Sequence, residues 1–356
     1  MRIYGTYEGY LTFIDAELFV GEKDGIFHVE ITYPTEGICH DKAENAICEG
    51  DSLTFQLGIN ESVADITAEL KDGSLEGSFD WEEGNIHGKF TLHKKSDDFV
   101  FGETKLIVPE TSRKLLMENH TFTNEEKIID FEYEFGNKEV LAFLKKEGIE
   151  TENHHDLETV RELLKQLSAV LSHDGMGHHH AKGFGTIEQF VYAKEHDSCT
   201  NCRGMAMIFS GIMRAYGFRS SYVELVPKEG QDEMIHVVCD VYVPEWKKYI
   251  LVDPTVGAIY YRDGKPLSLM ELRNVLAENK WESLTMDNFG QRKTDLLGAV
   301  GFTVRYLMKF IKCIKNTEAL GMENNCILLR PVELNGEMVT RNAIVTNNPD
   351  VFFSAE

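Results

Sequence analysis

The sequence predicts an α+β protein in which a small antiparallel β-barrel precedes a larger domain of helices and strands. Short strand-like runs separated by turns fill residues 7–94, whereas helical periodicity dominates after about residue 96. The chain of 356 residues also exceeds the usual span of one domain. We therefore expect a barrel domain at residues 1–96 and a mixed α+β domain at residues 97–356.

The barrel is predicted from the spacing of its strand-like runs and from the turns between them. Strands about ten residues apart that are joined by tight turns are typical of an antiparallel barrel or sandwich. Glycine-containing turn signals stand between several runs, at Lys23-Asp24-Gly25, Glu49-Gly50-Asp51, Lys71-Asp72-Gly73 and Glu83-Gly84-Asn85.

Capped helices and a pair of strands are predicted in the second domain. Residues 137–148 have a cap at Asn137 and a stop at Gly148, and Asp156 precedes a long apolar helical face. Further helices are expected at residues 186–196, 198–217 and 268–280, and strands at residues 234–243 and 246–253.

The most apolar late segment, residues 295–316, is interpreted as a buried helix. It contains Arg305, Lys309 and Lys312, and its uncharged run is shorter than the roughly 18 residues that a membrane span needs. We therefore expect no membrane-spanning segment here.

The charge balance argues against two classes of partner. The chain has 36 basic and 59 acidic residues, for a net charge of -23. An acidic surface repels phosphate backbones and anionic lipids, so neither nucleic acid nor a membrane is expected as a partner. The same charge also keeps a protein soluble.

The cysteines and the start of the chain indicate a reducing compartment. Seven cysteines at scattered spacings form no evident disulfide framework, and the first residues lack the basic start and long apolar core of a secretory signal. A cytoplasmic location is therefore expected.

A segment rich in glycine and histidine, residues 172–185, separates two of the expected helices. Its adjacent residues His178, His179 and His180 cannot all point at one metal from a regular element, and zinc would need further ligands in fixed geometry. We interpret the segment as a mobile surface loop, and we expect neither a metal nor a cofactor. Metal binding by one of these histidines is the weaker alternative.

Cys199 and Cys202 form a Cys-x-x-Cys pair immediately before an apolar helical segment. A structural zinc would need a second such pair, and a thioredoxin-type redox pair should follow the first strand of a βαβ unit. Neither context is present. Cys202 instead falls at the start of the expected helix, where unpaired N–H groups and the helix dipole favour a thiolate. The alternative is a small buried hydrophobe.

The two predicted strands contain the partners that a nucleophilic thiolate needs. His236 lies in the first strand, and Asp253 ends the second. In a hairpin these residues would fall within about two positions of each other, with side chains roughly 5 to 8 Å apart. A base and a group that orients it would then be in reach of the thiol. A buried core histidine and a turn aspartate are the alternatives.

Together, "NCRGMAMIFSGIMRAYGFRSSYVEL" and "HVVCDVYVPEWKKYILVDPT" resemble the core of the transglutaminase-like superfamily of papain-type cysteine enzymes. The downstream "GAIYYRDGKPLSLMELR" resembles the segment after this core in bacterial members. Asn201 and Val237 differ from the small residue and the aromatic residue of many relatives. The N-terminal runs resemble, more faintly, the lipocalin-like barrels that precede some bacterial hydrolases.

The resemblance implies a catalytic triad in which Cys202 is the nucleophile, His236 the base and Asp253 the orienting acid. It implies acyl transfer from a peptide or protein substrate, with water or an amine as acceptor, and we favour hydrolysis. The backbone N–H of Cys202 and, as a second candidate, the Gln189 side chain would stabilise the oxyanion. A non-catalytic binding protein on the same scaffold is the alternative from another class.

Overall fold

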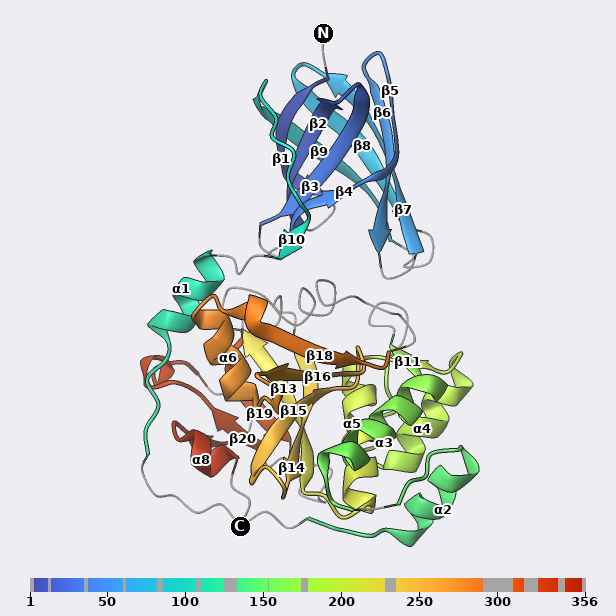
Figure 1. Cartoon of the computed structure of the whole chain (residues 1–356), viewed down its shortest axis with the longest axis vertical. Helices are drawn as coiled ribbons and strands as arrows, with labels where there is room; N and C mark the ends of the chain where they lie inside the picture. The colour runs from blue at the N-terminus through green and yellow to red at the C-terminus, as the bar shows by residue number, and fades with distance from the viewer. Residues whose placement is uncertain are drawn as a thin grey trace. The chain divides into compact units, whose positions relative to one another are not determined.

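The computed structural model divides the chain into two compact units, of which the first runs from Met1 to Pro109 and the second begins at Glu110 (Figure 1). The structure describes residues 3–11, 14–34, 38–59, 62–81, 86–106, 110–124, 133–152, 154–173, 179–227, 235–290, 310–316, 326–338 and 343–353.

The first unit is a nearly closed antiparallel barrel of nine strands with one short additional strand. The sheet order is β10-β4-β3-β2-β1-β9-β8-β7-β6-β5, so β1 pairs with both β2 and β9 and the strands follow chain order around the barrel (Figure 1). The strands are β1 Gly5–Leu11, β2 Ile14–Lys23, β3 Ile26–Tyr33, β4 Ile38–Lys42, β5 Glu44–Glu49, β6 Ser52–Ile59, β7 Ser62–Lys71, β8 Ser74–Trp81, β9 Ile86–Ser96 and β10 Lys105–Leu106.

Alternation of side chains along each strand builds the barrel core. On β7, Ile66, Ala68 and Leu70 are buried while the residues between them are exposed, and β6 and β8 contribute to the same apolar cluster. Successive side chains of a strand point to opposite faces, so a period of two separates core from solvent. The predicted barrel is therefore confirmed.

The predicted tight turns lie between the strands. Asp24 and Gly25 connect β2 to β3 with φ of 55° and 78°, and Asp72 and Gly73 connect β7 to β8 with φ of 49° and 84°. Aspartate and glycine tolerate this left-handed backbone, which matches the twist of a two-residue hairpin. The signal at Glu83-Gly84-Asn85 lies outside the described residues.

The first unit extends beyond the boundary expected at residue 96. Lys105 and Leu106 form β10, which pairs with Cys39 and Ile38 of β4. Gly102 also donates its N–H to Glu30 Oε2 at 2.9 Å. These bonds attach residues 97–106 to the barrel. The sequence does not predict β10, because a strand of only two residues shows no periodicity.

The second unit combines helices with a nine-stranded sheet among its described residues. The sheet order is β17-β16-β15-β14-β13-β19-β20-β21, and β18 pairs with β16. The helices are α1 Glu110–Glu118, α2 Lys138–Lys146, α3 Leu157–Val170, α4 Thr186–Glu195, α5 Cys202–Ala215, α6 Leu269–Ala277 and α8 Pro349–Phe352, with 3-10 turns at Trp281–Ser283 and Val332–Leu334. The strands are β11 Ser172–His173, β12 Cys199–Thr200, β13 Ser220–Pro227, β14 His236–Val243, β15 Lys248–Asp253, β16 Ala258–Arg262, β17 Lys265–Pro266, β18 Leu284–Asn288, β19 Phe310–Asn316, β20 Cys326–Leu329 and β21 Ala343–Thr346.

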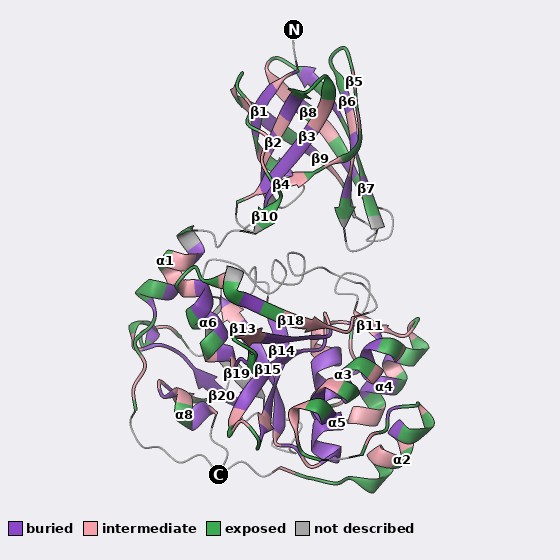
Figure 2. Cartoon of the chain, in the orientation of Figure 1, coloured by how far each residue is buried: buried purple, intermediate pink, exposed green. Residues whose placement is uncertain are grey.

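Helix α5 is the centre of the core of this unit. It contacts β13 and β14 on one side and α2, α3 and α4 on others, and every residue from Gly204 to Ala215 is buried (Figures 1 and 2). A helix of largely apolar sequence is stable when it is enclosed in this way. The element that begins with Cys202 is therefore held rigidly by the surrounding core.

The predicted helix starts are confirmed by side-chain caps. Asn137 Oδ1 accepts hydrogen bonds from the N–H groups of Glu139 and Val140, and Asp156 Oδ1 accepts one from Thr159. Such caps satisfy N–H groups that have no partner within the helix. The mixed α+β architecture with an N-terminal barrel therefore agrees with the sequence.

The prediction of a buried helix over residues 295–316 is wrong for its last part. Phe310–Asn316 form strand β19, which pairs with both β13 and β20. The periodicity of a short apolar run does not distinguish a strand from a buried helix segment. Residues 295–309 lie outside the described residues. No helix of the described part of the chain is long and apolar enough to cross a membrane.

Candidate active site

Cys202 is the first residue of α5, at the end where the helix dipole is positive. Asn201 caps this helix, and its Oδ1 accepts a hydrogen bond of 3.0 Å from Gly204 N–H. The free N–H groups and the positive end of the dipole favour a negative charge at the first turn. The position predicted for Cys202 from the sequence is thus the one it occupies.

A glycine allows the first turn of α5 to pack closely on the chain before it. A Cβ atom at Gly204 would lie 2.1 Å from Thr200 Oγ1, which no side chain could tolerate without a shift. Thr200 Oγ1 in turn donates to the His179 carbonyl at 2.7 Å. The close approach places β12 and residues 179–180 directly beside the thiol-bearing turn.

His236 and Asp253 meet across the β14–β15 hairpin. The register pairs Cys239 with Val252, so the two residues are diagonal neighbours at the end of the hairpin, and His236 Nε2 lies 2.9 Å from Asp253 Oδ2. The other carboxylate oxygen, Oδ1, accepts the Thr255 N–H at 3.0 Å. Both side chains are enclosed, with 1% and 0% of their surface exposed. The two hydrogen bonds fix the carboxylate and therefore orient the ring.

The thiol of Cys202 is hydrogen-bonded to His236 and also to His173. Because His236 Nε2 is bonded to Asp253, the nitrogen left for the thiol is Nδ1. Burial alone would raise the pKa of Cys202, but the hydrogen bonds and positive charges of the two imidazoles outweigh it and lower this pKa to about 6. The structure thus brings the three predicted triad residues together.

The surroundings of His236 favour its protonated, positively charged form. Burial would lower its pKa, but the charge of Asp253 and the hydrogen bond to it dominate and raise the pKa of His236 to about 10. A lowered thiol pKa beside a raised imidazole pKa favours the thiolate–imidazolium pair at neutral pH. This pair is the reactive form of a cysteine nucleophile.

His173 is a site residue that the sequence analysis missed. Strand β11 pairs with β12 in parallel, with Ser172 opposite Cys199 and His173 opposite Thr200. Ser172 Oγ and Cys199 Sγ are also hydrogen-bonded, at 2.8 Å. Cys199 therefore holds β11 against the segment that leads into α5. No local pattern marks a two-residue parallel strand, so its partner could not be found from the sequence.

The described residues 179–185 form a loop in which several residues are exposed, in line with the expected surface loop. His179 O accepts hydrogen bonds from Asn201 N–H and Thr200 Oγ1, and His180 Nδ1 lies 3.2 Å from Asn201 Nδ2. These bonds pack residues 179 and 180 against the start of α5. His178 lies outside the described residues. Among the described residues, no group of three metal-binding side chains is found.

Gln189, the predicted second oxyanion donor, is hydrogen-bonded to the backbone of residues 181 and 183. Its side chain is fully buried on α4, where Nε2 donates to the carbonyls of Ala181 and Gly183 and Oε1 accepts the Ala181 N–H at 3.1 Å. Each amide hydrogen of Gln189 therefore has a backbone acceptor. The residue therefore holds the turn at residues 181–183.

A buried ion pair anchors the residue next to the thiol. Arg203 Nη2 lies 2.9 Å from Glu224 Oε1, and the Glu224 side chain is 0% exposed on strand β13. Removal of Arg203 would leave the buried charge of Glu224 without compensation, which costs about 3 to 5 kcal/mol. The pair links the first turn of α5 to the sheet that carries His236.

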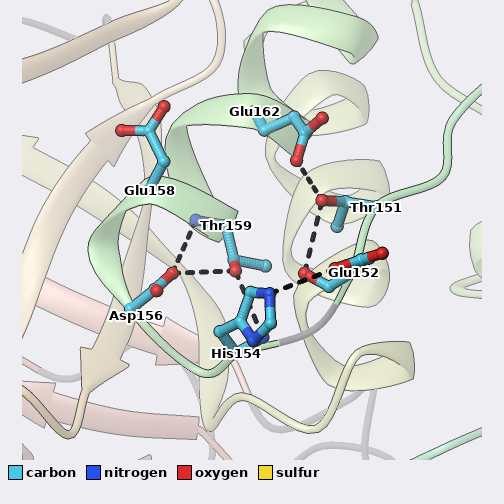
Figure 3. A pocket seen from close by; sticks show the side chains of 7 residues that line it. All are labelled: Thr151, Glu152, His154, Asp156, Glu158, Thr159 and Glu162. Atoms are coloured by element: carbon cyan, nitrogen blue, oxygen red, sulfur yellow. Dashed lines mark hydrogen bonds and ion pairs between the residues drawn. The ribbon is translucent and has the colours of Figure 1, made fainter.

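A separate polar pocket lies at the start of α3 and contains none of the triad residues (Figure 3). Asp156 in this pocket caps α3 through Thr159, and Glu162 is hydrogen-bonded to Thr151. These side chains stabilise the helix start. The pocket is lined by Thr151, Glu152, His154, Asp156, Glu158, Thr159 and Glu162.

Comparison with protein families, with curated proteins and with solved structures finds no match for this chain. The chemistry of the site therefore rests on its own geometry.

Alkylation of Cys202 is expected to depend on pH with a midpoint near 6. Because iodoacetamide reacts with the thiolate, its rate should fall as the pH drops through the pKa of about 6 and should stay high above it. An unperturbed cysteine has its midpoint at about 8.5. Mass spectrometry of the modified peptides measures both rates in one sample. Cys48, whose pKa is raised by burial, is the internal reference. A Cys202 midpoint at or above about 8.5 would contradict the thiolate–imidazolium pair.

Proposed function

We propose that the protein is a cysteine-dependent acyl-transfer enzyme of transglutaminase-like type that hydrolyses a peptide or protein amide bond. The observation that carries the proposal is the thiol of Cys202 hydrogen-bonded to His236, which is itself bonded to the buried carboxylate of Asp253 at 2.9 Å. A non-catalytic scaffold has no requirement for this arrangement, whereas acyl transfer requires each of its three groups.

In the first half of the reaction, the thiolate of Cys202 attacks the carbonyl carbon of the substrate and a tetrahedral oxyanion forms. The imidazolium of His236 then gives the proton on Nδ1 to the leaving nitrogen, and the C–N bond breaks. An acyl thioester and a free amine result. Proton transfer of this kind contributes about 10² to 10⁴ in rate.

In the second half, His236 is neutral and takes a proton from the acceptor as it attacks the thioester. With water as acceptor, the products are a carboxylic acid and the regenerated thiolate–imidazolium pair. Asp253 holds the ring throughout and compensates its charge. The backbone N–H of Cys202, at the first position of α5, supplies one oxyanion donor, because such N–H groups have no acceptor within the helix.

The acceptor decides which acyl transfer takes place. Water is the favoured acceptor because its concentration exceeds that of any amine. A lysine amine in the same position would give a cross-linked product from the same thioester. We therefore propose that the three residues carry out acyl transfer and that water accepts the acyl group.

A peptide library offered with an excess of a labelled primary amine tests this proposal. We expect products cut at peptide bonds, with the new carboxyl group taking oxygen from labelled water, and little amine incorporation. Mass spectrometry distinguishes the two products in one experiment. Dominant amine incorporation would replace hydrolysis by transamidation, and a complete lack of both products with a folded protein would reject acyl transfer.

A further inference from the structure

We propose that His173 is a catalytic residue of this site, the side-chain donor that stabilises the oxyanion formed when the thiolate of Cys202 attacks a carbonyl group. The inference rests on the proposed acyl transfer and adds to it the second oxyanion donor, which the triad leaves open.

The backbone places His173 beside the thiol. Its strand β11 lies in parallel register with β12, so that His173 is opposite Thr200, two residues before Cys202. The bond between Ser172 Oγ and Cys199 Sγ holds the same two strands together at 2.8 Å. The His173 ring is hydrogen-bonded to the Cys202 thiol, as the His236 ring is. Two imidazoles of different chain segments therefore contact one sulfur atom.

The two imidazoles are not equivalent. His236 is bonded to the carboxylate of Asp253 and is 1% exposed, as expected for the group that moves protons. His173 is only partly buried, so it is more accessible to solvent than His236 is. Because His236 already serves as acid and base, a second imidazole at the sulfur is available as a hydrogen-bond donor.

In the tetrahedral intermediate, a hydrogen-bond donor that contacts the sulfur also lies close to the oxyanion. The oxyanion is bonded to the carbon that the sulfur attacks, so it is separated from the sulfur by two bonds. An N–H group that contacts the sulfur in the resting enzyme can therefore turn to the oxyanion as it forms. His173 keeps its proton in this step, and no group is transferred to it. Gln189, which the sequence suggested for this role, is bonded to Ala181 and Gly183 instead.

Two reactions of the Cys202 thiolate distinguish stabilisation of the oxyanion by His173 from a general effect of His173 on the reactivity of the sulfur. Iodoacetamide is attacked at a saturated carbon and iodide leaves, so no oxyanion forms. p-Nitrophenyl acetate is attacked at a carbonyl carbon, so an oxyanion forms before p-nitrophenolate leaves and the thiol is acetylated. The rate constants for both reactions are measured over pH and divided by the thiolate fraction that each variant has at that pH.

For His173→Ala we expect the acetylation rate constant per thiolate to fall about 10² to 10³-fold, the usual effect of removing one oxyanion donor. The alkylation rate constant per thiolate should change by less than about threefold, because this reaction forms no oxyanion. His173→Gln, which keeps a side-chain N–H donor, should recover part of the acetylation rate. His154→Ala is the matched control, because His154 is an exposed histidine of the pocket at α3.

Equal losses in both reactions would overturn the proposal, since His173 would then act only on the thiolate. An unchanged acetylation rate constant in His173→Ala would overturn it as well. If the melting transition shows that His173→Ala does not fold, His173→Gln and His173→Asn are compared with the unsubstituted protein instead. The quantity compared is the acetylation rate constant divided by the alkylation rate constant, each per thiolate. Failure of the proposed function is a different result. In that case Cys202 of the unsubstituted protein would react with neither reagent faster than Cys48 does.

Discussion

The Cys202→Ala variant is expected to lose acyl-transfer activity by a factor on the order of 10⁶, comparable to the loss of a triad nucleophile in subtilisin. The sulfur forms the covalent bond to the acyl group, and neither Cys199 nor any other side chain of the first turn of α5 can replace it. The fold should remain, because alanine suits a helix start and the change removes one atom from a partly exposed position, with an expected cost of about 1 kcal/mol or less. Turnover and the thermal melting curve measure the two effects.

Cys199→Ser is the control for this substitution. Serine keeps a hydrogen-bonding group opposite Ser172, so β11 and β12 should stay paired and activity should remain within a few-fold. If Cys199→Ser were the inactive variant and Cys202→Ala the active one, the site would be built on the other thiol and the proposed triad would be wrong.

The Asp253→Asn variant is expected to have the second largest effect, a loss of about 10² to 10⁴ in turnover at neutral pH. Both carboxylate oxygens accept hydrogen bonds, one from Thr255 N–H and one from His236 Nε2. An amide has only one oxygen. Its NH₂ group must therefore face either the Thr255 N–H or the histidine. In the second case Nε2 of His236 must accept a hydrogen bond, so the ring carries its proton on Nδ1. Nδ1 can then no longer take a proton from the attacking water.

The same variant should also alter the titration of the thiol. Without the carboxylate charge, the pKa of His236 falls from about 10, and the imidazolium that stabilises the thiolate is lost at a lower pH. The midpoint of Cys202 alkylation should therefore move upward from about 6. Asp287→Asn is the control, because Asp287 is a partly buried carboxylate bonded to Arg161 and Tyr261. An unchanged midpoint in Asp253→Asn would show that the carboxylate does not set the charge of the ring.

Much of the fold is predictable because its signals are local. Aspartate and glycine at hairpin turns, alternating side chains in β7 and the capping residues Asn137 and Asp156 each act within a few positions of the chain. The steric and hydrogen-bonding rules that they obey need no knowledge of distant segments. Helix and strand positions in both units agree with the sequence for this reason.

The elements that differ from the prediction depend on distant partners. Phe310–Asn316 is a strand because β13 and β20 lie on either side of it, and an apolar run is compatible with either state. Lys105–Leu106 joins the barrel because β4 offers an open edge. Gln189 is bonded to the turn at residues 181–183, and the neighbouring residues 179 and 180 are bonded to the segment that leads into α5.

A thiol at a helix start, with a histidine and an aspartate on two consecutive strands, could be read from the chain alone, because helix caps and hairpin registers are set by neighbouring residues. The contact of a second histidine, His173, with the same sulfur could not. That contact requires β11 to pair in parallel with β12, across 27 residues from Ser172 to Cys199. Parallel pairing depends on how the intervening helix α4 packs against α5, and packing is a property of the whole core.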